Sequence, residues 1–327
     1  MERTGQENGN RQGDYPKTEK GWCIIEKILI EQILQMLLLA CIGFLLFRYG
    51  KISVEGSKTL GNILIYVSLP AVIINSFLIE RTPEHMAGIL WSAAAALVIL
   101  LISVSVSHFA FRNDPIGSFA AAFSNPGFFG IPLIIASVGQ GAVFYVACFI
   151  SFLNLGQWTY GVSRLNGQPV LQGFRLSKLI RAPFMIAILA GLLLFFTLIQ
   201  LPDVFRGILT TAAGINTPLA MFTVGVYLAQ TDFLKMFRRK SLYLITAVRL
   251  LAIPLVSILL LSLLPAELNS MKTALMLAAA CPVGSNVAVY AQLHGKDHTY
   301  AVETVLISTL LSVLTIPLLY KFSTLFW

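Results

Sequence analysis

The sequence predicts an all-α polytopic membrane protein with ten transmembrane helices. Hydrophobic residues make up 57% of the chain and charged residues only 12%, whereas a soluble globular domain carries roughly 25% charged residues. The apolar residues also gather in runs of about 20, the length that a helix needs to cross a bilayer. These runs lack the alternation of apolar and polar residues that is typical of membrane β-barrels, so helices are favoured over strands.

Ten apolar segments can be drawn in order along the chain. They lie near residues 27–47, 58–79, 86–110, 115–138, 141–163, 180–200, 204–230, 241–264, 271–293 and 299–320. The longest polar gap separates the fifth segment from the sixth and contains several basic residues. We therefore expect a first five-helix repeat at 25–164, a basic linker at 165–179 and a second five-helix repeat at 180–327. The polar stretch 1–24 is expected to be a disordered tail.

The basic residues between the segments predict the orientation in the membrane. The net charge of +8 arises largely from Lys and Arg in short loops, which is typical of topology signals and not of a nucleic-acid-binding surface. Counted together with the first three residues of the following segment, the loops after segments one, three, five, seven and nine carry 13 Lys and Arg, and the other loops carry 3. Since basic loops remain in the cytoplasm, we expect a cytoplasmic linker and two extracytoplasmic termini in a plasma (inner) membrane protein.

Matching helix-breaking residues predict two related halves. The fourth segment contains SNPGFFGIP at 124–132, and the ninth contains CPVGSN at 281–286. The second and seventh segments, YVSLPAVIINSF at 66–77 and GINTPLAMFTV at 214–224, each combine a proline with an asparagine. Because five helices precede and five follow the linker, the halves must have opposite orientations, as in the inverted repeats of secondary transporters.

The interruptions in segments four and nine predict a ligand site. Lipid cannot satisfy the main-chain groups that a broken helix exposes, so such a break must lie within protein or beside a water-filled cavity. The new helix N-terminus that follows each break favours an anion. We expect the two breaks to meet near the bilayer midplane, where Asn125 and Asn286 hydrogen-bond a small ligand. The predicted substrate-binding residues are Asn125, Pro126, Gly127, Asn216, Pro282, Gly284, Ser285 and Asn286.

The motif FSNPGFFGIPL at 123–133 resembles the signature of the auxin efflux carrier family, and INTPLAMFTVGVYLA at 215–229 and VLISTLLSVLTIPLL at 305–319 extend the resemblance. It implies a bile-acid-symporter and NhaA-like plan with broken, crossing helices four and nine. It also implies a scaffold of helices one, two, six and seven, a moving unit of the other six, and a homodimer. Family members with a short central linker are generally regarded as permeases for organic acids such as malate or malonate. The resemblance therefore implies a substrate of this class. The family usually has Thr where this chain has Pro126.

Two charged residues within the apolar segments are candidates for charge or proton coupling. Arg249 lies in the eighth segment, where a charge costs about 2.5–3.5 kcal/mol on insertion scales and should face protein or a cavity. It could attract a carboxylate, or it could extend to the headgroups from near the helix end. Glu303 opens the tenth segment and could carry a proton, or it could be a solvated carboxylate at a helix start.

The leading functional hypothesis is a secondary active transporter, a permease or efflux carrier, for a small mono- or dicarboxylate. The substrate would bind where helices four and nine cross and move by elevator-type alternating access, with a proton or sodium as a coupling ion. The alternatives are a sodium-coupled bile-acid-type symporter and a membrane sensor that does not transport. No metal-ligand spacing and no nucleophile motif occurs in the sequence, so neither an enzyme nor a cofactor is expected.

Overall fold

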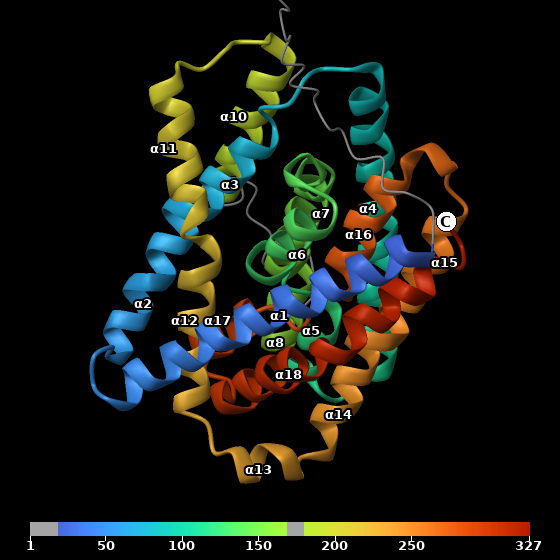
Figure 1. Cartoon of the computed structure of the whole chain (residues 1–327). Coiled ribbons are helices and arrows are strands. Elements are labelled where there is room, and N and C mark those ends of the chain that lie inside the picture. Colours follow the sequence, from blue (N-terminus) through green and yellow to red (C-terminus); the bar gives the residue numbers. More distant parts are fainter. Residues whose placement is uncertain (1–18, 169–179) are drawn as a thin grey trace, which may run out of the picture.

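The computed structural model describes residues 19–168 and 180–327, which are predominantly helical (Figure 1). The first half contains α1 (Glu19–Arg48), α2 (Val54–Ile63), α3 (Leu69–Ser76), α4 (Pro83–Ala110), α5 (Pro115–Ala122), α6 (Ile131–Ser137), α7 (Val143–Gly156) and α8 (Val162–Asn166). The second half contains α10 (Pro183–Thr197), α11 (Asp203–Gly214), α12 (Asn216–Ala229), α13 (Phe233–Arg238), α14 (Lys240–Ala247), α15 (Ile253–Ser262), α16 (Asn269–Ala280), α17 (Asn286–Leu293) and α18 (His298–Ser323).

Within residues 19–168 and 180–327, seven helical segments are long and apolar enough to cross a membrane. They are Ile25–Arg48, Val54–Ser76, His85–Ala110, Gln140–Asn166, Asp203–Ala229, Lys240–Ser262 and His298–Ser323. These seven overlap the predicted segments one, two, three, five, seven, eight and ten. The sixth coincides with the shorter helix α10, and the fourth and ninth are interrupted. The prediction of an all-helical polytopic membrane protein is confirmed, while the count of ten spans and the inverted repeat stay predictions.

The first helix begins earlier than the sequence analysis placed it. α1 starts at Glu19, so residues 19–24, which were assigned to the disordered tail, are helical. The apolar run already begins at Trp22, and extending an existing helix costs little compared with starting one. The rest of the predicted tail, residues 1–18, and most of the predicted linker, residues 169–179, lie outside the described residues.

Prolines explain most of the irregular turns within the helices. Three segments widen into a π-helical turn that a proline follows two residues later: Leu64–Ser68 before Pro70, Pro126–Gly130 before Pro132, and Val248–Ala252 before Pro254. Each proline lacks the N–H that the carbonyl four residues earlier would accept, and that carbonyl lies in the widened turn. The turns at 126–130 and 248–252 carry residues of the predicted site.

Glycines allow α1 and α12 to pack backbone against backbone (Figure 1). A Cβ on Gly225 would overlap the carbonyl oxygen of Ala40, and one on Gly43 would lie 2.5 Å from the carbonyl oxygen of Phe222. Small residues at such interfaces are typical of membrane helix pairs, in which close van der Waals packing drives association. The pair therefore forms a tightly packed unit.

The interrupted segments lie deep inside the protein. All residues from Ala274 to Cys281 at the end of α16 are fully buried, as are Ala120 and Ala121 near the end of α5. Many large apolar side chains of α1, α4, α10 and α11 are instead exposed on the outside. An apolar exterior around buried helix ends is what a bilayer requires, because lipid cannot hydrogen-bond the open main chain.

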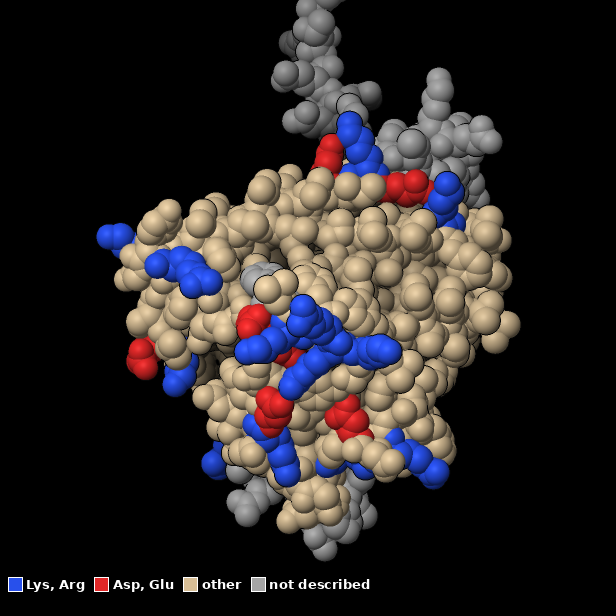
Figure 2. Space-filling view, turned by 90° about the horizontal axis from the view of Figure 1, so that it is seen from below, with Lys and Arg blue, Asp and Glu red and all other residues tan. Residues whose placement is uncertain are grey.

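Charged side chains gather on the face at the bottom of Figure 1, where α13 lies. Figure 2 views this face and shows a group of Lys and Arg side chains near its middle, with acidic side chains beside it and largely uncharged surface around it. The sequence analysis predicts that the loop containing α13 is cytoplasmic. The orientation of this face in the membrane stays a prediction of the positive-inside rule.

Candidate functional site

The interruption of the fourth segment starts where α5 ends at Ala122. Phe123 is extended, with φ −116° and ψ 114°, and Asn125 caps the next helical turn by accepting a hydrogen bond from the Phe128 N–H at 3.3 Å. Pro126 occupies the first position of that turn, where the missing N–H of a proline costs nothing because the first N–H groups of a helix have no partner within it. The chain thus ends one helix and begins another within a few residues.

The ninth segment breaks in a similar manner. α16 ends at Ala280, Cys281 is extended with φ −60° and ψ 150°, and α17 begins at Asn286 after the cap residue Ser285. Pro282 cannot donate a main-chain hydrogen bond and favours an extended residue before it, which ends α16. Both breaks therefore follow directly from helix-breaking residues that the sequence analysis singled out.

The two breaks satisfy each other's main chain. The Asn125 N–H donates to the Pro282 carbonyl and the Gly284 N–H donates to the Phe123 carbonyl, both at 2.9 Å, forming an isolated antiparallel bridge between Ser124 and Val283. These two hydrogen bonds satisfy main-chain N–H and C=O groups that lipid could not hydrogen-bond. The two interrupted segments consequently meet at their breaks, although the bonded residues are 161 positions apart in the Phe123–Gly284 pair and 157 in the Asn125–Pro282 pair.

A small pocket lies directly beside this junction. Its volume is about 40 Å³, which is room for a few water molecules. The lining residues are Leu69, Ser124, Asn125, Pro126, Gly127, Phe128, Ile150, Leu153, Asn154, Gln157, Gly284, Ser285 and Asn286. This lining contains amides, hydroxyls and the first residues of two helical turns, and none of its residues carries a charge. The pocket is therefore polar yet uncharged.

Side-chain hydrogen bonds orient the amides of the pocket. The Asn125 Nδ2 donates to Ser285 Oγ at 3.2 Å, and the Asn286 Nδ2 donates to Gln157 Oε1 at 2.8 Å. Ser124 Oγ is buried and has no hydrogen-bond partner. An unpaired hydroxyl costs free energy in a buried place unless a ligand or water satisfies it. The junction accordingly contains a buried hydroxyl, that of Ser124, whose hydrogen-bonding capacity is not satisfied by any of the described residues.

Six of the eight predicted substrate-binding residues line the pocket, and Pro282 and Asn216 do not. Pro282 contributes the carbonyl that accepts the Asn125 N–H. Asn216, at the start of α12, donates from Nδ2 to the Gly127 carbonyl at 3.2 Å, while its buried Oδ1 has no partner. Asn216 thus joins α12 to the break of the fourth segment and does not face the pocket.

Arg249 is not among the residues that line the pocket and instead contacts the helix ends that precede the two breaks. Its buried guanidinium donates to the carbonyls of Ala121 and Ala122, at 3.1 and 3.2 Å, and to the Ala279 carbonyl. The idea that Arg249 extends to the headgroups is wrong, because the side chain is 1% exposed. A direct attraction of a carboxylate in the pocket is likewise not what this geometry provides, since Arg249 is absent from the lining.

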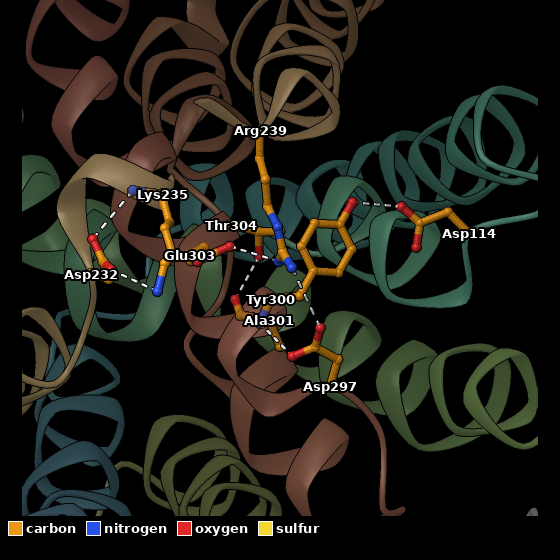
Figure 3. A network of polar contacts seen from close by, with 9 residues as sticks. All are labelled: Asp114, Asp232, Lys235, Arg239, Asp297, Tyr300, Ala301, Glu303 and Thr304. Atoms are coloured by element: carbon orange, nitrogen blue, oxygen red, sulfur yellow. Dashed lines mark hydrogen bonds and ion pairs between the residues drawn. The ribbon is translucent and has the colours of Figure 1, made fainter. Parts of the chain in front are cut away.

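Glu303 belongs to a separate polar network on the charged face (Figure 3). Its carboxylate accepts a hydrogen bond from Arg239 at 2.8 Å, and Arg239 also lies 3.9 Å from Asp297 and over the ring of Tyr300. The Tyr300 hydroxyl donates to Asp114 at 2.7 Å. Glu303 is buried and ion-paired, so the alternative of a solvated carboxylate at a helix start is wrong.

Sequence reasoning missed three polar members of the pocket. Gln157 and Asn154 were not among the predicted binding residues, and Ser124 was only part of the motif. Two amides within the apolar fifth segment were a usable signal, because buried amides need partners. No group of three His, Cys, Asp or Glu that could hold a metal ion occurs in residues 19–168 and 180–327.

Comparisons with known proteins give consistent matches. A family model described as "Membrane transport protein" matches residues 169–320. The chain is 28% identical over 295 residues to a protein of Rhizobium meliloti named "Putative malonate transporter", covering 85% of this chain and 91% of the relative. It is also 28% identical over 306 residues to a protein of Methanothermobacter thermautotrophicus named "Uncharacterized transporter", covering 88% of this chain and 96% of that relative. Both relatives match well beyond the region of the family model.

Proposed function

We propose that this chain, which is a transporter rather than an enzyme, is a secondary active transporter for a small organic anion. The match of residues 169–320 to the membrane transport protein model and the two relatives named as transporters support this proposal. The substrate is a mono- or dicarboxylate of few carbon atoms. It binds in the pocket beside the junction of the two interrupted helices and crosses the membrane by elevator-type alternating access.

The observation that carries this proposal is the convergence of two helix starts on an uncharged pocket. Pro126 and Gly127 open one helical turn, Asn286 opens α17, and all three line the pocket. Each helix N-terminus is equivalent to roughly +0.5 elementary charge, so two together complement about one carboxylate. The amides of Asn125 and Asn286 supply additional donors. A site of this kind holds an anion without a fixed cationic side chain, which eases release.

The dimensions of the pocket favour a compact acid. A volume of about 40 Å³ matches a few water molecules, whereas sites for drug-sized ligands measure roughly 300–1,000 Å³. A sterol-sized substrate of a bile-acid-type symporter is accordingly disfavoured. The relative named for malonate suggests a dicarboxylate of this size as the first substrate to test.

The proposed movement places the pocket at the boundary between scaffold and moving unit. Leu69 of α3 lies in the part expected to be scaffold, and the other lining residues lie in the part expected to move. Asn216 also bridges this boundary through one hydrogen bond to Gly127, a contact worth about 0.5–1.5 kcal/mol that can exchange for another during sliding. A homodimer through the scaffold and two extracytoplasmic termini complete the proposal.

Counterflow in liposomes tests the proposal regardless of the coupling ion. Purified protein is reconstituted with unlabelled malonate inside, and uptake of labelled malonate, malate, succinate and lactate is followed. We expect transient accumulation of at least one acid, which protein-free liposomes do not show. Electrical recording on solid-supported membranes then distinguishes electrogenic transport, which gives a transient current, from electroneutral transport, which does not. The absence of exchange for every acid contradicts the organic-anion assignment.

The Gln157–Asn286 pair provides a prediction at the pocket. Replacing Gln157 with Leu leaves the Asn286 amide without its 2.8 Å acceptor, and an unsatisfied buried donor costs about 1–3 kcal/mol. We expect the apparent KM for the transported acid to rise about tenfold, which corresponds to roughly 1.4 kcal/mol. The matched control is Gln157→Glu, which keeps the acceptor oxygen but brings a negative charge. It should lose affinity for the acid, and it should also lose thermal stability while the carboxylate is ionised, because Gln157 is 1% exposed.

A further inference from the structure

We propose that Arg249 is a built-in cation that neutralises the converging C-terminal ends of the two interrupted helices, so that this point of the transporter needs no bound sodium ion. The inference deepens the proposed function by assigning part of its ion requirement. It concerns the C-terminal ends of α5 and α16, which precede the two breaks, whereas the helix starts that follow the breaks line the pocket.

The geometry of the guanidinium carries the argument. Ala121 and Ala122 are the last two residues of α5, and Ala279 is the penultimate residue of α16. The last carbonyls of a helix have no partner within it, and the breaks leave these carbonyls buried. Arg249 donates to one or two carbonyls on each helix end at the same time. One side chain therefore satisfies both broken ends.

The charge of the guanidinium is also balanced, although its buried Nε has no hydrogen-bond partner in the described part of the chain. The C-terminus of a helix is equivalent to roughly −0.5 elementary charge, so two converging ends carry about −1. A guanidinium supplies one positive charge, and it remains protonated in proteins. None of the ion pairs found among the described residues includes Arg249, and its hydrogen bonds go to main-chain carbonyls. The helix ends themselves are its counter-charge.

This arrangement is chemically equivalent to a cation site. Main-chain carbonyls at the C-terminal ends of half-helices are the ligands by which broken-helix transporters coordinate Na⁺. Here the guanidinium occupies that position permanently, held by a widened helical turn at Val248–Ala252. Removal of the charge should leave carbonyls that accept an external cation. An ordinary packing role for Arg249 does not lead to that expectation.

The experiment compares Arg249→Lys, which keeps a positive charge, with Arg249→Met, which keeps length but is neutral. Thermal unfolding of each purified protein is measured in sodium chloride, in choline chloride and with millimolar guanidinium chloride, at equal ionic strength. We expect the Lys variant to unfold at a higher temperature than the Met variant. Guanidinium or sodium should raise the unfolding temperature of the Met variant selectively. If only the Lys variant can be purified as a folded protein, that outcome also supports the proposal. A Met variant whose unfolding temperature equals or exceeds that of the Lys variant overturns it.

The unaltered protein gives a result even if neither variant can be purified. With Arg249 in place, sodium should not stabilise it relative to choline, and malonate exchange should proceed at the same rate in either salt. A saturable, sodium-specific rise in unfolding temperature overturns the built-in cation. Because unfolding is measured without substrate, this failure is distinguishable from failure of the organic-anion proposal, which counterflow reports. Arg206→Met, at an exposed position of α11, controls for a general effect of removing a positive charge.

Discussion

Replacing Asn125 with Ala should reduce transport of the acid at least about a hundredfold while the protein remains folded. The side chain of Asn125 both caps the helical turn that starts at Pro126 and donates to Ser285 across the junction. Loss of such a cap costs about 0.5–2 kcal/mol, and loss of a ligand contact adds to it. Each 1.4 kcal/mol corresponds to a tenfold change, so the two losses together reach the expected size.

Folding should survive because the main chain carries the junction. The bond from the Asn125 N–H to the Pro282 carbonyl does not involve the side chain, and the reciprocal bond from Gly284 to Phe123 is untouched. The backbone of residue 125 has φ −111° and ψ 62°, on the side of the φ/ψ map that an L-residue occupies without αL strain. The size-exclusion profile should therefore match that of the unaltered protein, and the unfolding temperature should fall only by the amount that the lost cap accounts for.

Two further variants separate binding from structure at this position. Asn125→Asp keeps the acceptor that caps the turn but places a negative charge beside the bound anion, so it should fold normally and transport no acid. Asn75→Ala, on α3 outside the pocket lining, should transport as the unaltered protein does. Normal exchange by the Asn125→Ala protein would show that the acid binds elsewhere.

The positions of the breaks could be predicted from sequence because their causes are local. Proline removes a main-chain donor wherever it occurs, and Asn125-Pro126-Gly127 and Pro282-Val283-Gly284 fall in the middle of apolar runs. The same reasoning led to the expectation that these breaks meet, since lipid leaves them no other partner. Most of the predicted binding residues line the pocket for this reason.

The partners of the buried polar side chains could not be predicted, because they depend on packing between distant segments. Arg249 bonds carbonyls that lie 128 and 30 positions away along the chain, at Ala121 and Ala279. Its presence in an apolar run indicates that it is buried, but which end of a broken helix it meets follows only from three-dimensional arrangement. Gln157 is similar, since its acceptor role depends on Asn286 in the other half.

Replacing Gly225 with Ala should prevent normal packing of α1 against α12 and sharply lower the yield of folded protein. The added Cβ would overlap the Ala40 carbonyl oxygen and lie 2.6 Å from the Phe44 nitrogen. Both are main-chain atoms, so no side-chain rotation relieves the overlap, and the helices must separate. Overpacking of this kind costs typically 1–3 kcal/mol and sometimes more. Fluorescence-detected size-exclusion chromatography and thermal unfolding in detergent measure the effect.

Gly207→Ala is the matched control, because a Cβ at this exposed position of α11 meets nothing within 4 Å. Alanine is a better helix former than glycine by up to about 1 kcal/mol, so this variant should be at least as stable as the unaltered protein. The same substitution thus has opposite expected signs on two neighbouring helices, and propensity alone cannot produce that difference. Equal stability of the two variants would mean that α1 and α12 tolerate a wider separation. In that case the pair could not act as the rigid part of a scaffold against which the remaining helices slide.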